Sequence, residues 1–143
     1  MATKTSLKRS LKDADLIETK ALPAAASTAV STDPIDTGVR TDRASPATGL
    51  GASLSVPALS ATIVPNTKTV TLAIEASTTE NFASSEVLRE AVLTGAGGAG
   101  VSAARIDVTL PEDCPRYIRG TVTFGADTTT GAAKTAELAL LAG

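Results

Sequence analysis

The sequence predicts an all-β fold: an antiparallel jelly-roll-like sandwich or barrel, with an N-terminal arm that contains a short helix. Several segments alternate apolar and polar residues with a period of two, which is typical of strands with one buried face. Clusters of Gly, Pro, Asn and Ser separate these segments at nearly regular spacing. No helix-length segment interrupts them, which argues against a doubly wound α/β fold and favours a sandwich or jelly roll.

The first twenty residues differ from the rest of the chain. Leu7, Leu11 and Ala14 recur at positions i, i+4 and i+7, which predicts an amphipathic helix of about three turns. The segment carries four basic residues before its first acid: Lys4, Lys8, Arg9 and Lys12. It is either an arm that folds against another subunit, with its basic side facing an acidic surface, or a frayed terminus.

Residues 21–51 are small and polar, with Pro and Gly throughout, and they predict loops with one short strand near residues 35–39. The clear β pattern begins after this stretch. We therefore predict two parts. Residues 1–32 form the arm, a short helix plus an extended linker, and residues 33–143 form the β-sandwich or jelly-roll-like domain.

The strand pattern is clearest where aliphatic residues occupy every second position, as with Val70, Leu72 and Ile74. Four segments are predicted on this basis: residues 68–76, 105–110, 117–124 and 135–141. Residues 53–63 are a further strand, which Pro57 predicts to be an edge or bulged strand. Residues 85–94 have a composition that suits a helix, but their length and neighbours favour a strand.

The composition removes much of the catalytic toolkit. The 143 residues include no His and one Cys, which excludes His-based nucleophile pairs, His metal ligands and an internal disulfide. Cys114 follows Asp113, an acid that would hinder thiolate formation. Residues 95–100 match G-x-G-x-x-G, but a strand follows instead of a helix, so we interpret them as a flexible hairpin loop. We expect a protein that is not an enzyme and has no cofactor or metal.

Charge and hydropathy limit the partners. A net charge of −2 argues against a general nucleic-acid binder. No apolar run approaches the roughly 20 residues of a membrane-spanning helix, and no apolar stretch follows the basic N-terminus as in a secretory signal. We therefore expect no membrane or nucleic-acid partner, no small-molecule substrate, and synthesis in a cytoplasm.

Three polar residues, Arg116, Tyr117 and Arg119, form the densest polar cluster on a predicted strand. The cluster is either a solvated strand face, where Arg stems cover apolar surface, or a subunit contact, since Arg and Tyr are favoured at interface hot spots.

Several short segments resemble the capsid cement, or decoration, proteins of tailed bacteriophages, of the jelly-roll-like β type. Residues 35–38 (IDTG) resemble an early Ile-Asp-x-Gly segment of that family, and residues 70–82 resemble a strand followed by a Ser/Thr-acid loop that ends in Phe. Residues 116–119 (RYIR), followed by Thr-Val-Thr, resemble the start of a penultimate hairpin. A small-residue loop (125–133) and a terminal strand (135–141) complete the pattern, whereas the basic arm in residues 1–32 goes beyond it.

The resemblance implies a virion protein, made in the host cytoplasm, that binds the outer surface of the phage head. Its partner would be the major capsid protein, and it would act as a homodimer or a trimer that stabilises contacts between capsomers. On this hypothesis Leu7, Leu11 and the four basic residues of the arm attach it to the capsid. Arg116, Tyr117 and Arg119 would contribute to a subunit interface.

Three other classes remain open. A carbohydrate-binding or adhesin-like sandwich should expose aromatic residues, which make up only 2% of the chain. An enzyme with a carboxylate pair would need acids in a cleft, whereas the close pairs lie in polar or turn-like segments: Asp13/Asp15, Asp33/Asp36 and Glu112/Asp113. Another head or tail structural protein would differ in its copy number per particle.

Overall fold

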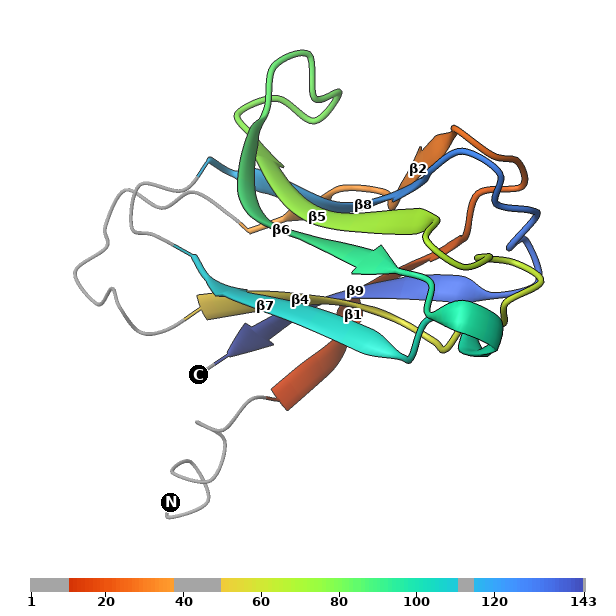
Figure 1. Cartoon of the computed structure of the whole chain (residues 1–143). Helices are drawn as coiled ribbons and strands as arrows, with labels where there is room; N and C mark the ends of the chain where they lie inside the picture. Colours follow the sequence, from red (N-terminus) through yellow and green to blue (C-terminus); the bar gives the residue numbers. More distant parts are fainter. Residues whose placement is uncertain (1–10, 38–49, 111–114, 143) are drawn as a thin grey trace.

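Two antiparallel sheets face each other in the computed structural model, which describes residues 11–37, 50–110 and 115–142 (Figure 1). The first sheet has the strand order β1-β9-β4-β7, formed by β1 (Leu11–Ala21), β9 (Thr135–Ala142), β4 (Leu50–Val56) and β7 (Ala104–Thr109). The second has the order β2-β8-β5-β6, formed by β2 (Ala29–Ser31), β8 (Tyr117–Phe124), β5 (Thr69–Ser77) and β6 (Glu86–Thr94). The two-residue β3 (Ile35–Asp36) also pairs with β8.

The strand pairing is that of a jelly roll. The first half of the chain pairs with the second half in antiparallel ladders, β1 with β9, β2 with β8, β4 with β7 and β5 with β6. The chain is thus one long hairpin that is folded over into two sheets, with the β5–β6 turn at its tip. The prediction of an all-β, jelly-roll-like sandwich is confirmed.

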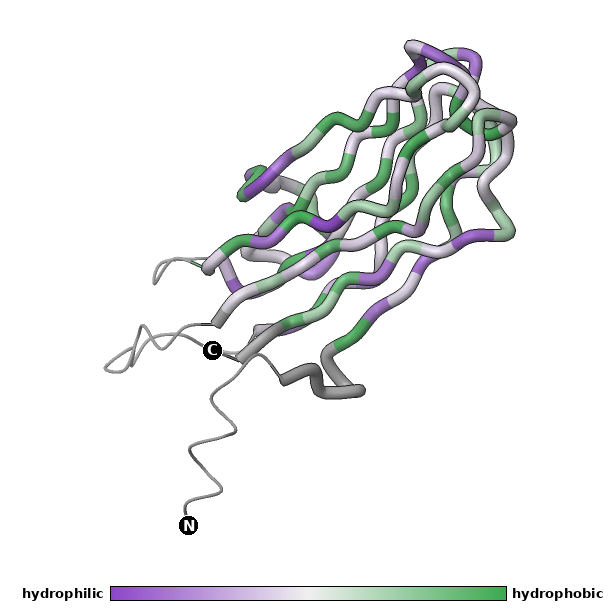
Figure 2. The backbone as a smooth tube through the Cα atoms, turned by 60° about the horizontal axis from the view of Figure 1, so that its bottom comes forward, coloured by the Kyte–Doolittle hydropathy of each residue, from purple (hydrophilic) through white to green (hydrophobic). Residues whose placement is uncertain are grey.

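The core lies between the sheets, where the apolar residues of the alternating pattern meet. Leu54 is opposite Leu138 in one sheet and Leu72 is opposite Val122 in the other, and all four are fully or almost fully buried. Hydrophobic and hydrophilic positions alternate along the strands in Figure 2. Phe124 is the largest fully buried side chain, and almost all the other large buried ones are Leu, Ile or Val. Aliphatic residues therefore supply most of the core, as the composition predicts.

The helix predicted for residues 1–20 is wrong from Leu11 onward. Residues 11–21 form β1, in which Leu11 is opposite Ala142 and Lys12 is opposite Leu141. Pairing with β9 satisfies the backbone groups of both strands, and such tertiary pairing outweighs the weak helix preference of a short segment. Lys4, Leu7, Lys8 and Arg9 lie outside the described residues.

The predicted domain boundary between residues 32 and 33 would separate β1 and β2 from the strands with which they pair. Both β1 and β2 fall within the predicted arm, yet they pair with β9 and β8. Residues 11–31 are therefore integral to the sandwich.

Two further expectations are corrected. The strand predicted for residues 53–63 is β4, which ends at Val56 before Pro57 and lies between β9 and β7, so it is central and not an edge strand. The 95–100 segment is not a hairpin loop, because it connects β6 to β7 in the opposite sheet and contains a short 3-10 turn, η2 (Gly97–Ala99).

The other strand predictions are confirmed, with β8 matching its predicted bounds and residues 86–94 forming strand β6. The short strand expected near residues 35–39 is present as β3. In the part of the chain that the structure describes, no helix is long and apolar enough to cross a membrane.

Candidate interaction surface

An ion pair on the outer face of the β8–β5 ladder ties the predicted Arg cluster to the neighbouring strand. Arg119 Nε donates a hydrogen bond of 2.8 Å to Glu75 Oε1, and Thr121 Oγ1 donates one of 3.2 Å to the same oxygen. The side chains of Arg119 and Glu75 are 28% and 16% exposed, so this pair is largely shielded from water. Both charges are therefore held in fixed positions by the fold.

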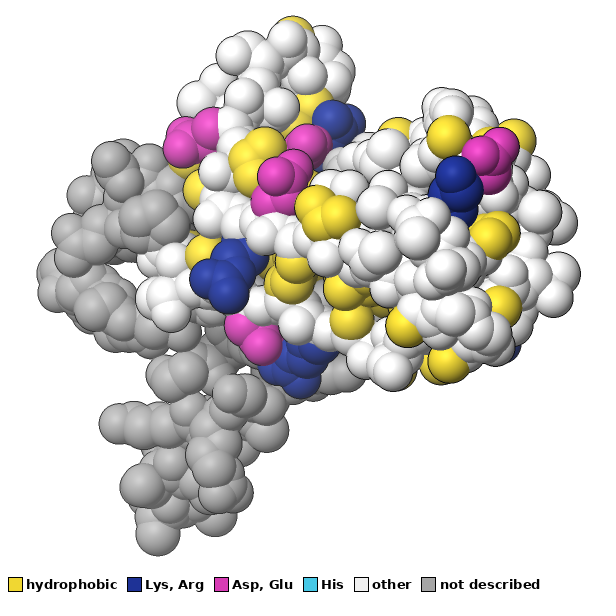
Figure 3. Space-filling view, viewed as in Figure 1, with side chains coloured by type: hydrophobic (Ala, Val, Ile, Leu, Met, Phe, Trp, Pro, Cys, Tyr) yellow, Lys and Arg dark blue, Asp and Glu magenta, His cyan; other side chains and the backbone are white. Residues whose placement is uncertain are grey.

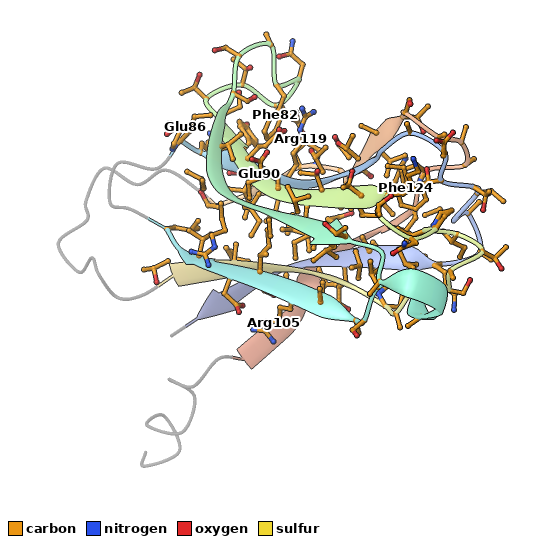
Figure 4. All side chains as sticks on the ribbon, in the orientation of Figure 1. Phe82, Glu86, Glu90, Arg105, Arg119 and Phe124 are labelled. Atoms are coloured by element: carbon orange, nitrogen blue, oxygen red, sulfur yellow. The ribbon has the colours of Figure 1, made fainter. Side chains whose placement is uncertain are left out.

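Phe82, from the loop that joins β5 to β6, covers this ion pair. Its ring centroid lies 4.4 Å from the guanidinium carbon of Arg119, within the range of a cation–π contact (Figure 4). The backbone of Phe82 has a φ of 51°, a left-handed conformation that is uncommon for a bulky residue. The loop thus places one of the few aromatic side chains against the sheet.

The same loop, residues 78–85, projects from the end of the sandwich in Figure 1 and is held together by short polar side chains. Ser77 Oγ donates to the carbonyl oxygen of Ser84 at 2.6 Å and accepts from the amide of Thr79 at 3.1 Å. Asn81 Oδ1 accepts from both Thr79 Oγ1 and the amide of Ala83. These bonds give the loop a defined shape from which Thr78, Glu80 and Asn81 are exposed.

Arg116, just before β8, binds β3. Its Nε and Nη2 atoms each donate a 2.7 Å hydrogen bond to one carboxylate oxygen of Asp36, and its guanidinium lies 5.4 Å from the ring centroid of Tyr117. The hydrogen bond to Asp36, and then the charge of that carboxylate, raises the pKa of Arg116. This bidentate pair joins segments that are 80 residues apart in the sequence.

Beyond the Arg119–Glu75 pair, short side chains occupy the outer face of β2, β8 and β5. The register that places Arg119 opposite Glu75 also places Thr121 opposite Ala73 and Thr123 opposite Thr71, all on this face. Ser31 on β2 adds a hydroxyl contact to Thr121 at 3.0 Å. We call this surface the Thr-rich face, defined by Ser31, Thr71, Thr121 and Thr123, whereas Ala73, opposite Thr121, is only 6% exposed.

Hollows lined by described residues lie at the margins of the sandwich, and the two considered next gather no catalytic groups. One, of about 410 Å³, is lined by small and aliphatic residues between β6 and β7, including Val92, Val101 and Ala104. The other, of about 150 Å³, lies at the base of the 78–85 loop and is lined by Ser77, Glu86 and Pro115 among others. Among the described residues, no three His, Cys, Asp or Glu side chains converge as metal ligands would.

The predicted contact residues fall into two groups. Arg116, Tyr117 and Arg119 lie together at and near the start of β8, where both arginines are engaged within the chain. Leu11 and Lys12 are in β1, in the other sheet. The other predicted contact residues, Lys4, Leu7, Lys8 and Arg9, lie outside the described part. Glu75, Asp36 and Phe82 were not predicted as partners of the arginines, since these partners come from distant strands and loops.

Comparisons with known proteins support the fold. No protein-family model matches the chain, and no curated protein does. Among solved structures, the PBSX exported protein XepA aligns with 87% of this chain at a TM-score of 0.53 and 18% sequence identity, and the chain spans 37% of the length of XepA. PirA aligns with 90% of this chain and 95% of its own at a TM-score of 0.46 and 8% identity. A chain of the Cowpea Mosaic Virus empty virus-like particle aligns with 90% of this chain and 78% of its own, at a TM-score of 0.46 and 13% identity. The likeness to XepA shows a shared β fold.

Proposed function

We propose that this protein is a non-enzymatic capsid cement, or decoration, protein. It binds the outside of an assembled phage head and stabilises contacts between capsomers of the major capsid protein. The jelly roll that the sequence predicted and the motifs that resemble the cement family support this assignment. The observation that carries it furthest is the Thr-rich face, which has the properties that docking on a large rigid shell requires.

Docking costs free energy for every flexible side chain that it immobilises, about 0.5–1.5 kcal/mol for a side chain with many rotamers. The Thr-rich face presents Ser and Thr side chains, which have few rotamers to lose. The long side chain of Arg119 is already fixed by Glu75 and Phe82 before any partner arrives. The face can therefore approach a flat protein surface closely at a small entropic cost.

The basic N-terminal residues supply a second contact in this proposal. Lys4, Lys8 and Arg9 precede β1, which begins at Leu11 at the edge of the other sheet. An acidic capsid surface would attract this segment, and added salt would weaken the attraction because it screens exposed charges. Bound copies would raise the stability of the shell by mass action.

The test is co-sedimentation of the purified full chain with expanded heads that lack it, with bound copies counted against the major capsid protein. We expect saturable binding at one fixed ratio and heads that withstand higher temperatures. Absence of binding to heads shown to be expanded and intact would overturn the proposal. A screen against immobilised glycans would then test the surface-binding alternative.

A further inference from the structure

Strand β6, at one end of the β2-β8-β5-β6 sheet, presents different side chains from its neighbours on the outer face. Val87 and Val92 are 53% and 57% exposed, and they are the exposed large hydrophobic residues of the described chain. They lie five residues apart, which in a regular strand would place them on opposite faces. A register shift in the β5–β6 ladder places Val87 opposite Glu75 and Val92 opposite Thr71, so both valines lie on the outer face.

An acidic residue lies between the two valines on the same face. Glu90 is opposite Ala73, which is itself opposite Thr121 on the outer face, and the side chain of Glu90 is exposed. Glu90 is two residues from Val92, a spacing of about 7 Å along a strand. We call Val87, Glu90 and Val92 the β6 patch. Figure 3 shows hydrophobic and acidic side chains together over β6, and Figure 4 labels Glu90 on this strand.

The charge of Glu90 is not balanced within the described chain. No hydrogen bond or ion pair joins Glu90 to another described residue. On the neighbouring strand the charge of Glu75 is balanced by Arg119, to which it is hydrogen-bonded. Arg89 is next to Glu90 in the sequence but is opposite Ile74, which places it on the other face of the sheet. The β6 patch thus carries one negative charge between two apolar side chains.

The β6 patch is continuous with the Thr-rich face. Val92 is opposite Thr71, and Thr71 is opposite Thr123, so one row of residues crosses β6, β5 and β8. A flat surface that is seated on these threonines also covers Val92. Beside Val92 lies the hollow of about 410 Å³ between β6 and β7, which no charged residue lines and which is large enough for an apolar side chain of a partner.

Contact with a partner would remove water from Glu90. Burial of exposed aliphatic groups is favourable, and the two valines are the described positions that gain most from it. A partner that covers both valines also covers the carboxylate between them, and a buried carboxylate without an opposite charge is strongly destabilising. The β6 patch therefore favours a surface that brings a positive charge to Glu90, and it rejects one that is wholly apolar or acidic.

We propose that the β6 patch selects the surface of the major capsid protein on which this chain docks. That surface presents a Lys or Arg side chain to Glu90, and aliphatic groups on either side of it cover Val87 and Val92. The inference rests on the proposed function, because it names the chemistry of the capsid surface that the Thr-rich face approaches. The Thr-rich face gives close contact at a small entropic cost, and the β6 patch adds the apolar burial and the charge match that give specificity.

Co-sedimentation with expanded heads that lack the protein tests the charge match. Glu90→Gln should weaken binding about tenfold and Glu90→Lys about a hundredfold, because the first removes the match and the second places two positive charges together. Glu86→Gln and Glu86→Lys are the matched controls. They make the same changes at an exposed position of the same strand, opposite Ala76 on the other face, and should leave the affinity within about twofold of the wild type.

The apolar part of the β6 patch is tested with Val87→Thr and Val92→Thr. Threonine keeps the β-branched shape and the strand preference of valine, so only the polarity of the side chain changes. Each substitution should weaken binding to the heads about threefold to tenfold, because a hydroxyl is buried at the contact. Far-UV circular dichroism and urea denaturation confirm that each variant is folded.

The outcomes separate this inference from the proposed function. A wild-type chain that does not bind intact expanded heads overturns the proposed function and this inference with it. Wild-type binding that Glu90→Lys leaves unchanged overturns the inference alone. Sedimentation equilibrium without heads should give the same oligomeric state for the wild type and the variants. A variant that changes this state but binds heads normally would assign the β6 patch to a contact between copies, and that also overturns the inference.

Discussion

Arg119 and Glu75 form a 2.8 Å hydrogen-bonded ion pair across β8 and β5, although they are 44 residues apart in the sequence. Because both side chains are mostly buried, removal of one partner leaves the other charge poorly solvated. We expect Arg119→Ala to lower the free energy of unfolding by about 1–2 kcal/mol, and Glu75→Ala to have a similar effect. Removal of both residues leaves no unpaired charge, so the double variant should lose less than the sum of the single losses.

Urea denaturation of the four proteins of this double-mutant cycle measures the coupling directly. Losses that add within about 0.3 kcal/mol would show that the pair contributes nothing beyond its separate side chains. Arg119→Lys is an informative companion, because Lys keeps the charge but not the planar group that lies over Phe82.

The glycine-rich connection between β6 and β7 contains a matched pair of positions. Gly100 has φ 68° and ψ −137°, a conformation that residues with a Cβ rarely adopt, and an added Cβ would clash with the backbone of Leu59 and Ser60. An added Cβ at Gly98 would meet nothing within 4 Å. We expect Gly100→Ala to lower the free energy of unfolding by about 2 kcal/mol or more, and Gly98→Ala to change it by less than about 0.5 kcal/mol.

Thermal and urea unfolding of these two variants provide the measurement. The added Cβ at position 100 would also press on the bridge in which Leu59 and Val101 exchange backbone hydrogen bonds of 2.9 Å. This bridge holds the connection against the sandwich. Equal stabilities of the two alanine variants would contradict the conformation assigned to Gly100.

The contrast between β8 and β1 shows what the sequence could and could not predict about the fold. Within β8, Ile118, Val122 and Phe124 alternate with polar residues, so its period of two is visible locally. In the first twenty residues, Leu7, Leu11 and Ala14 fit a helical period. What makes residues 11–21 a strand is the pairing with β9, more than a hundred residues away, which no local pattern reports.

The candidate surface shows the same division. The basic cluster at Arg116 and Arg119 was visible in the sequence because its charged residues are close together. Their partners, Asp36 and Glu75, were separated from them by 80 and 44 residues. The register shift in the β5–β6 ladder, which places Val87 and Val92 on one face, follows from the three-dimensional pairing, and the sequence of this segment was ambiguous between helix and strand.

The Thr-rich face gives a direct test of capsid attachment. Thr123→Lys adds a long charged side chain to this face, and we expect it to weaken binding to expanded heads about tenfold or more, since the charge would be buried at the contact. Thr109→Lys makes the same change at an exposed position of β7, in the opposite sheet, and should leave the affinity unchanged. Co-sedimentation at several protein concentrations measures both. Equal binding of the two variants would place the contact elsewhere.

The hypothesis that the N-terminal residues attach the protein to the capsid needs a truncation that leaves β1 and its pairing with β9 intact. Deletion of residues 1–20 would remove most of β1 and leave the edge of β9 without its partner, so any loss of binding could reflect unfolding. Deletion of residues 1–10 stops before Leu11, keeps the β1–β9 ladder and removes Lys4, Lys8 and Arg9.

We expect this shorter deletion to unfold at the wild-type urea midpoint but to bind heads more weakly. The attraction is between exposed charges, and the distance over which salt screens them falls below about 10 Å as the salt concentration rises past about 0.1 M. The difference in affinity between the deletion and the wild type should therefore shrink as salt rises from roughly 50 to 300 mM. A chain with Lys4→Gln, Lys8→Gln and Arg9→Gln separates charge from length and should behave like the deletion. Wild-type affinity of the shorter deletion at low salt would show that these residues do not attach the protein to the capsid.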